Sequence, residues 1–328
     1  MSVRIGVSFD GFAPFDEALD TAKNAVAAGA KSLWMAEHLG YREAIVSCTA
    51  FALATQNAVV VPTAVSPYVS HPTPLAMALA TIAEAAPGRA AIALGTGNPL
   101  FLQESGQEII KPIKAMREFV QCLHLLWSGE PAHLQGELFS LAGARMAFKP
   151  PAPIPIYIAA MREQMMRLAG RIADGVVLSA GLSAGFAAHS LGWARAGAVE
   201  AGRDPATVRA AAYLYCSVSE DGRTAVDLIR GKLAFLFRNK HLAENIQHSG
   251  IAIDQPAIMA AVAKRDLDAA ARLVPDEAVE AFAIAGTPKA CRDQLDAFVK
   301  AGVGEPVLVI LGDATSCQLA LRLVNAFA

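Results

Sequence analysis

Short runs of apolar residues alternate along the chain with longer, alanine-rich stretches. The short runs are apolar on both faces, as in strands of a parallel sheet that helices cover on either side. They lie at residues 4–9, 32–35, 59–61, 90–94, 156–158, 175–178, 211–218 and 306–310. The longer stretches, such as residues 18–28, 164–169 and 290–301, read as helices that end at a glycine. Eight such units predict an α/β fold of the (β/α)8 type, a TIM barrel, rather than an open sheet.

Two segments do not fit this alternation. Residues 132–148 contain Gly136, Phe139 and Gly143 among alternating apolar positions, and this pattern predicts a hairpin insertion. Residues 237–285 are helical in pattern and more charged, which predicts a helical insertion late in the chain that could form a lid over the barrel mouth. No linker rich in Pro, Gly or Ser divides the chain, so residues 1–328 are expected to form one barrel domain.

Composition narrows the class of protein. Of 328 residues, 54% are hydrophobic and only 18% are charged, which excludes a disordered chain. A net charge of −2 argues against a broad basic surface for nucleic acid. No unbroken apolar stretch is long enough to cross a membrane, and the first residues lack a signal-peptide pattern. The five scattered cysteines read as reduced thiols, so we expect a cytoplasmic protein without nucleic-acid or membrane partners.

In a barrel of this kind, chemistry is expected where strands end and loops begin. The second predicted strand runs directly into Glu37 and His38. A carboxylate beside an imidazole could position a substrate or move a proton, and these two residues are the catalytic candidates. The alternative is that His38 only packs or caps a loop.

Two further strand ends carry candidate binding residues. The fourth ends in Gly95-Thr96-Gly97-Asn98, which lacks the third glycine of a dinucleotide-binding turn and better suits close approach by a flat ring. The fifth ends at Met161-Arg162 and opens a helix, whose N-terminus could hold a phosphate or could be an ordinary helix start.

Other barrel chemistries lack their signatures. The seven histidines are scattered, and neither His-x-His nor His-Glu-x-x-His occurs, so no metal site is expected. Gly-x-Ser-x-Gly, the nucleophile turn of a serine hydrolase, is also absent.

Three motifs together resemble the luciferase-like superfamily of flavin- and deazaflavin-dependent oxidoreductases, most of all its methylene-tetrahydromethanopterin reductase-like branch. They are residues 33–38 (Leu-Trp-Met-Ala-Glu-His), residues 87–97 (Pro-Gly-Arg before a strand that ends Gly-Thr-Gly) and residues 168–176 (Leu-Ala-Gly-Arg-Ile-Ala-Asp-Gly-Val). The resemblance covers most of residues 3–180 and the final helix–strand unit, and it is weak over residues 219–285.

This resemblance implies a barrel, usually dimeric, with an isoalloxazine-type ring at its mouth. It implies that Glu37 and His38 lie near that ring and that a non-prolyl cis peptide between Ala64 and Val65 lies behind it. Thr96 and Asn98 would line the polar side of the ring. The implied phosphate-binding residues are Ala159, Ala160, Met161, Ser179 and Ala180.

The chain departs from the family pattern at three positions. Glu37 replaces the usual aspartate, Asn98 stands where the dehydrogenase branch has a glutamate proton donor, and Met161-Arg162 occupy a loop that commonly contains glycine.

We therefore expect an oxidoreductase that transfers hydride through a bound deazaflavin of the coenzyme F420 type to or from a small organic substrate. An FMN-dependent monooxygenase that uses reduced flavin and oxygen is the alternative, and a flavin-binding barrel without catalysis is a second one. A homodimer is expected from the resemblance.

Overall fold

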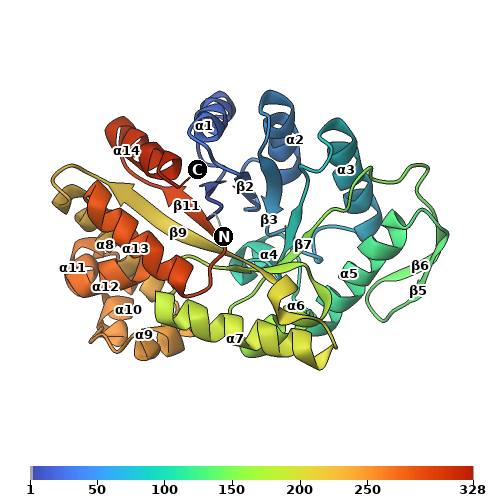
Figure 1. Ribbon diagram of the computed structural model, residues 1–328. Coiled ribbons are helices and arrows are strands. Elements are labelled where there is room, and N and C mark those ends of the chain that lie inside the picture. Colours follow the sequence, from blue (N-terminus) through green and yellow to red (C-terminus); the bar gives the residue numbers. More distant parts are fainter. Residues whose placement is uncertain (1–2, 328) are drawn as a thin grey trace.

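Eight parallel strands form a ring, and helices pack around its outside (Figure 1). The computed structural model describes residues 3–327. The barrel strands are β1 (Gly6–Phe9), β2 (Ser32–Ala36), β3 (Val59–Thr63), β4 (Ile92–Leu94), β7 (Ile156–Ala159), β8 (Gly175–Leu178), β9 (Arg209–Val218) and β11 (Glu305–Ile310). They pair in the order β3-β2-β1-β11-β9-β8-β7-β4. Each of them coincides with one of the apolar runs, so the predicted (β/α)8 barrel is confirmed.

The ring closes between β3 and β4 through two isolated bridges. Val60 pairs with Ala90, and the N–H of Ala91 donates to the carbonyl oxygen of Val60 at 3.1 Å. Val65, just beyond β3, pairs with Leu94. No sheet edge is therefore left open between these two strands.

The outer layer follows the predicted alternation of strand and helix. Its helices are α1 (Phe15–Ala27), α2 (Ala44–Ala54), α3 (Pro72–Ala85), α5 (Pro112–Trp127), α6 (Glu163–Ile172), α7 (Ala184–Glu200), α13 (Pro288–Lys300) and α14 (Ala314–Asn325), with the short α4 (Pro99–Glu104) before α5. α6 continues past Gly170, where the sequence predicts its end, to Ile172. α3 begins at Pro72. Pro72 suits a first helical position, and the Nδ1 atom of His71 accepts the N–H of Thr73 at 3.2 Å.

Two apolar cores result from the alternating strand side chains. One lies between the strands and the helices. The other fills the barrel and is built around Trp34, whose ring meets Tyr157 edge-on at 5.4 Å between ring centres. The indole N–H of Trp34 donates to the Ser32 hydroxyl at 2.7 Å, and that hydroxyl donates to the buried Glu305 carboxylate. Gly6 faces this group, since a Cβ there would lie 2.6 Å from the Ser32 hydroxyl. The interior of the barrel is thus filled by Trp34 together with Tyr157 and smaller apolar side chains.

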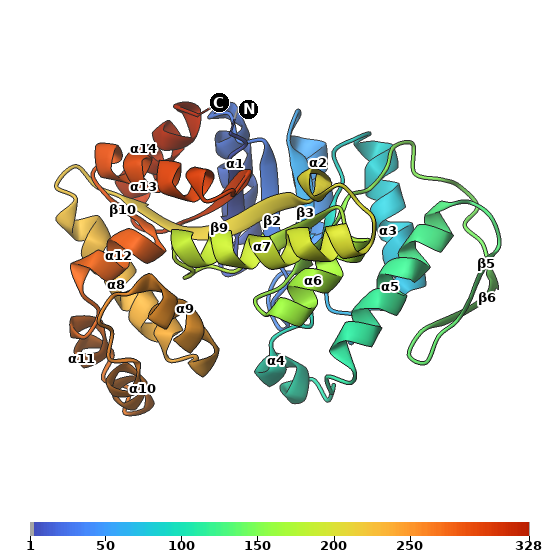
Figure 2. The same cartoon turned by 60° about the horizontal axis from the view of Figure 1, so that its bottom comes forward.

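The two irregular segments lie on opposite sides of the barrel (Figure 2). One is an antiparallel hairpin, β5 (Ala132–Gln135) and β6 (Ser140–Ala144). The other lies between β9 and α13. It comprises α8 (Arg223–Phe237), η2 (Lys240–Leu242), α9 (Ala243–Ser249), α10 (Gln255–Ala263), α11 (Leu267–Arg272), α12 (Asp276–Phe282) and β10 (Ile284–Gly286).

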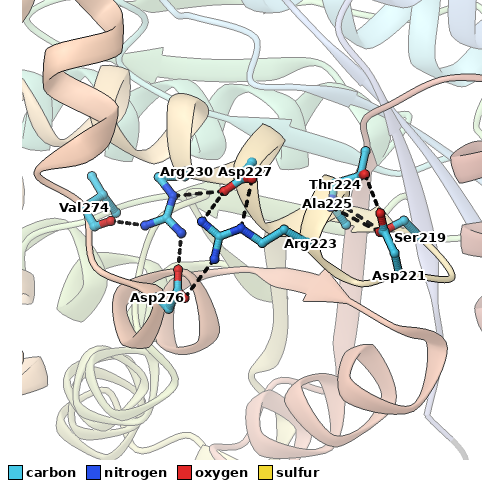
Figure 3. Close-up of polar contacts among 9 residues, drawn as sticks. All are labelled: Ser219, Asp221, Arg223, Thr224, Ala225, Asp227, Arg230, Val274 and Asp276. Carbon is cyan, nitrogen blue, oxygen red and sulfur yellow. Dashed lines mark hydrogen bonds and ion pairs between the residues drawn. The ribbon is translucent and has the colours of Figure 1, made fainter.

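An ion-pair network ties the two ends of this second segment together (Figure 3). The guanidinium of Arg223 on α8 contacts Asp227 at 2.8 Å and Asp276 on α12 at 3.2 Å. Arg230 also contacts Asp276 and donates to the carbonyl oxygen of Val274. Because Asp276 accepts from two guanidinium groups, α8 and α12 are held side by side. The helices between them therefore form a segment whose two ends lie next to each other.

No helix among residues 3–327 combines the length and the apolar character needed to cross a membrane.

The tip of the hairpin is fixed by one buried carboxylate. Glu118 on α5 is 6% exposed and accepts the backbone N–H groups of residues 137–139 at 2.8–3.0 Å. Burial alone would raise the pKa of Glu118, but these three N–H groups outweigh it and hold the pKa below its usual range.

We expect Glu118→Gln to destabilise the protein by about 1–3 kcal/mol, because an amide cannot accept all three N–H groups as a carboxylate does. A carboxyl with a lowered folded-state pKa stabilises the fold above its unfolded pKa and loses that contribution as pH falls through its folded pKa. The difference between variant and wild type, measured by urea unfolding, should therefore shrink at acid pH. Glu130→Gln, at an exposed position near the hairpin, is the control. Equal stability of Glu118→Gln and wild type at pH 7 would contradict the prediction.

Candidate functional site

The carboxyl ends of the eight strands form the mouth of the barrel, where the candidate residues gather. Along β2, Leu33 and Met35 point to the outer core, whereas Trp34 fills the inner one. The same alternation carries Ala36 and then His38 toward the barrel axis. His38 therefore enters the mouth above the tryptophan.

Aromatic side chains from two loops and from the short helix α4 surround His38. The Phe12 ring lies parallel to the imidazole, with 6.1 Å between ring centres and 7° between planes. Tyr41 and Phe101 meet it edge-on at 6.2 and 6.1 Å. Burial among these rings lowers the pKa of His38, and the negative charge of Asp10 opposes the shift. His38 is therefore a neutral imidazole near pH 7, able to accept a proton or a hydrogen bond.

Glu37 points the other way, although it is adjacent to His38 in the sequence. Its carboxylate accepts the N–H of Ala44 at 2.9 Å at the start of α2. Burial raises the pKa of Glu37, the Ala44 N–H lowers it, and the charge of Glu43 raises it again. Among the described residues, it forms no hydrogen bond with His38, so the structure does not bring the two catalytic candidates together.

Small residues make the inner wall of the mouth shallow. A Cβ added to Gly95 would lie 2.8 Å from the Cβ of Ala64 and 3.5 Å from that of Ala159. Ala64 and Gly95 directly follow β3 and β4, Ala159 is the last residue of β7, and the space above them is free of large side chains from their own positions. The surface has the shallow shape that the face of a flat ring requires.

The cis peptide lies one residue earlier than predicted. The structure has it between Thr63 and Ala64, so the prediction of a cis bond between Ala64 and Val65 is wrong. Val65 is held as a strand residue instead, because its N–H donates to Ala93 at 2.9 Å and its carbonyl accepts from Gly95 at 3.1 Å. Its side chain is 2% exposed and packs in the outer core.

Thr96 and Asn98 both take part in shaping their loop. The carbonyl oxygen of Thr96 accepts the Ser66 hydroxyl at 3.2 Å. The side-chain oxygen of Asn98 accepts the N–H of Leu100 at 3.0 Å and so caps α4. Gly97 between them has a φ of +85°, which favours glycine. Asn98 is thus a helix cap.

The predicted phosphate end brings residues of β7 and β8 together. Ala160 is tied to β8 by its N–H, which donates to Val177 at 3.2 Å, and Met161 follows at the edge of a cavity. Ser179 and Ala180 directly follow β8. The Ser179 hydroxyl is buried and has no hydrogen-bond partner among the described residues. An unpartnered buried hydroxyl beside a helix start fits a ligand oxygen, and the shallow wall fits a ring, so these residues suit a flavin-type cofactor with a phosphate.

Within residues 3–327, no three His, Cys, Asp or Glu side chains are grouped as metal ligands would be.

The sequence interpretation missed the aromatic residues around His38. Phe12 and Tyr41 come from two loops and Phe101 from the short helix α4, and their only signal is that large rings stand near predicted strand ends. Phe12 is 57% exposed, and Arg42 holds its loop by donating to the carbonyl oxygens of Gly11 and Phe12 at 2.9 and 3.1 Å.

Comparison with known proteins identifies relatives over nearly the whole chain. Residues 3–305 match the family described as luciferase-like monooxygenase. A 5,10-methylenetetrahydromethanopterin reductase of Archaeoglobus fulgidus is 30% identical over 312 residues, which cover 93% of this chain and 92% of that protein.

Solved structures show the same fold. The coenzyme F420-dependent tetrahydromethanopterin reductase of Methanopyrus kandleri superposes with a TM-score of 0.90 at 24% identity, covering 99% of this chain and 98% of that one. An F420-dependent secondary alcohol dehydrogenase, solved with an F420–acetone adduct, has a TM-score of 0.81 at 21% identity and covers 100% of this chain and 98% of its own.

The surroundings of His38 lead to a test by NMR. We expect the imidazole to titrate below the ordinary histidine range, and Asp10→Asn to lower its midpoint further by removing the opposing charge. A lowered pKa also means that stability is complete at neutral pH and falls as pH drops through the ordinary histidine pKa. Asp16→Asn, in the exposed first turn of α1, is the control. An unchanged or raised midpoint in Asp10→Asn would contradict this account.

Proposed function

The chain belongs to the luciferase-like monooxygenase family, and from this premise we propose that it is an oxidoreductase that transfers hydride between a bound deazaflavin of the coenzyme F420 type and a small organic substrate. The geometry that carries the proposal is the shallow wall of Gly95, Ala64 and Ala159 beside the neutral imidazole of His38. The similarity to proteins named as tetrahydromethanopterin reductases favours a deazaflavin over FMN.

The proposed cofactor contacts divide between two parts of the mouth. The ring would lie against Ala64 and Gly95, with the backbone near Thr96 at its polar side. The phosphate would lie near Ala160 and Met161, where the Ser179 hydroxyl can donate to it. The bound deazaflavin would supply the hydride chemistry, and the protein would place substrate and cofactor together.

His38 is the residue that we propose to move the proton. Glu37 and Asn98 both accept backbone N–H groups at helix starts, so neither is placed to donate a proton into the mouth. A neutral imidazole can accept a proton from a substrate that is being oxidised, and it can return that proton in the reverse direction. Phe12 and Tyr41 would exclude water from it.

An FMN-dependent monooxygenase is the alternative, and the family description favours keeping it. The same shallow wall accepts the isoalloxazine ring of FMN, which has the same shape as a deazaflavin ring. A barrel that binds flavin without catalysis is the second alternative, favoured by the engagement of Asn98 and Glu37 in helix caps.

Domain organisation and location are also proposals. Buried residues of the late insertion, such as Phe237, Ile258 and Phe282, lie in the same apolar core as the barrel, which supports one domain over residues 1–328. All five cysteines are free, and four of them are buried, which supports a reducing compartment such as the cytoplasm.

The function is tested by titrating the protein with F420 and with FMN, each oxidised and reduced, under anaerobic conditions. We expect tight binding of F420 and hydride exchange with substrates from a panel of alcohols, aldehydes and methylene-bridged amines. His38→Asn should keep cofactor affinity and lose about a hundred-fold or more in turnover.

Three outcomes would change the assignment. Oxygen-dependent product formation with reduced FMN would establish the monooxygenase instead. Binding of either cofactor without turnover on any substrate would favour the non-catalytic barrel. Binding of neither cofactor would remove the proposed function altogether, and full activity in His38→Asn would remove only the role of that residue.

A homodimer is supported by an apolar outer surface on α2. This helix contains no charged residue, yet Val46 and Leu53, two turns apart, are 66% and 69% exposed. Met77 on the neighbouring α3 is 51% exposed. A helix that is apolar on all sides is normally buried, and a second copy of the chain would cover this surface.

We expect wild type to sediment at twice the chain mass of 34.3 kDa and Val46→Asp/Leu53→Asp to sediment as a monomer. Two charges that lose water at an interface would oppose association. Val199→Asp, at a 61% exposed position on α7, is the matched control and should stay dimeric. A double variant that remains dimeric would place the interface elsewhere, and a monomeric wild type would refute the dimer.

A further inference from the structure

A cavity of about 370 Å³ opens beside the predicted phosphate end of the mouth. It lies between the start of α6, the first half of α7 and the segment η2–α9 of the late insertion. Leu182, Phe186 and Leu242 form an apolar interior, and each is at most 3% exposed. Arg162 and Lys240 stand at its edge, one from the barrel and one from the insertion.

Arg162 and Lys240 make the edge of the cavity positively charged, and His241 adds no charge to it. The Arg162 guanidinium contacts the Nδ1 atom of His241. Burial, together with the charges of Arg162 and Lys240, lowers the pKa of His241, so this imidazole is neutral and accepts a hydrogen bond from Arg162. His241 therefore orients the guanidinium.

Two carboxylates also line the cavity, and they do not cancel these cations. Glu163 is bound to Arg167 on the next turn of α6, at 2.7 Å between oxygen and Nε. Of the lining carboxylates, Glu244 then remains to offset the positive charges of Arg162 and Lys240. The lining residues carry two cations and two carboxylates, and with the charge of Glu163 offset by Arg167 one positive charge remains in excess, which favours an anionic ligand.

The backbone adds to this preference. α6 begins at Glu163, and Arg162 in the cap position gives it no side-chain hydrogen bond. The first N–H groups of this ten-residue helix, and the positive end of its dipole, are therefore available beside the two cations.

The wall that the insertion supplies is tied to the barrel. The Asn245 side chain is 1% exposed, accepts the N–H of Ser183 at 3.0 Å and donates to the carbonyl oxygen of Gly181 at 2.8 Å. Gln255 donates to the carbonyl oxygens of Phe237 and Asn239, which fixes the turn before Lys240. The cavity is thus a built feature that joins the two parts of the chain.

We propose that this cavity binds the anionic chain of the cofactor beyond its phosphate, with Arg162 and Lys240 as carboxylate ligands. The proposal rests on the proposed function. A ring at Ala64 and Gly95 and a phosphate at Ala160 and Met161 define a direction across the mouth, and Met161 and Arg162 continue it into the cavity. Coenzyme F420 carries carboxylates beyond its phosphate and FMN does not, so the cavity would select F420.

The chemistry of the two cations suits this ligand. A guanidinium matches a carboxylate with two parallel hydrogen bonds, and an ammonium adds a mobile point charge. The apolar interior would contact the methylene groups between the carboxylates. Because Lys240 belongs to the insertion, a bound chain would also bridge the insertion and the barrel.

The test compares Arg162→Gln/Lys240→Gln with wild type by fluorescence titration, using F420, FMN and the deazaflavin nucleoside that lacks phosphate and carboxylates. We expect the double variant to bind F420 about tenfold or more weakly and to bind FMN and the nucleoside as wild type does. The salt dependence of F420 affinity should also become weaker. Lys232→Gln, an exposed position on α8, changes the charge without touching the cavity and should behave as wild type.

The other outcomes either contradict the proposal or separate its failure from the failure of the proposed function. Unchanged F420 affinity would overturn it, and an equal loss for FMN would show that the two cations hold the phosphate instead. If wild type binds no deazaflavin, the proposed function fails, and a triglutamate peptide then tests the cavity alone. Peptide binding that the double variant loses would support an anion site, and no binding to wild type would overturn it.

Discussion

The filling of the barrel by Trp34 is the constraint on which the rest of the structure depends. A closed ring of eight strands leaves an interior that side chains must occupy, and here the Trp34 indole does so together with Tyr157, Val307 and smaller apolar residues. Its N–H is satisfied by Ser32, and its bulk is accommodated by Gly6 on the neighbouring strand. Since the tryptophan occupies the centre, the next level can be built from small residues. The shallow mouth is a consequence of this division.

The geometry of β2 also explains why the adjacent residues Glu37 and His38 point in different directions. With Trp34 pointing inward, the period of two, continued past the end of β2 at Ala36, sends position 38 inward and position 37 outward. Glu37 meets the start of α2 and accepts its first N–H, where the helix dipole also favours a negative charge. The imidazole is left among aromatic rings, which lower its pKa. A pair that looks like one catalytic unit in the sequence thus divides into a helix cap and a mouth residue.

Most of the fold could be predicted because its signals are local. Runs such as residues 175–178 are buried on both faces, and glycines such as Gly29 and Gly302 follow helix ends, so every barrel strand was recognisable, although Gly170 lies inside α6 and not at its end. The site depended on contacts that the sequence does not show. Asn98 became a cap because α4 starts at Pro99, and the cis peptide moved to Thr63–Ala64 while Val65 stayed paired with β4. The cavity brings Arg162 and Lys240 together although 78 positions separate them in the sequence, so no local motif could indicate this pair.

The late insertion supplies a second cation to the cavity, which the strand ends of the barrel lack. Near β7 and β8 the barrel offers small residues and one unpartnered hydroxyl, Ser179, but a single cation, Arg162, reaches the cavity from that side. The segment from η2 to α9 brings Lys240 and the neutral His241 against it, and Asn245 holds them there. The Asp276 network at the base of the insertion fixes where this segment returns to the barrel (Figure 3). In the proposed assignment, the ring site of the barrel is extended by a charged compartment that the insertion completes, so changes there would alter ligand choice without disturbing the barrel core.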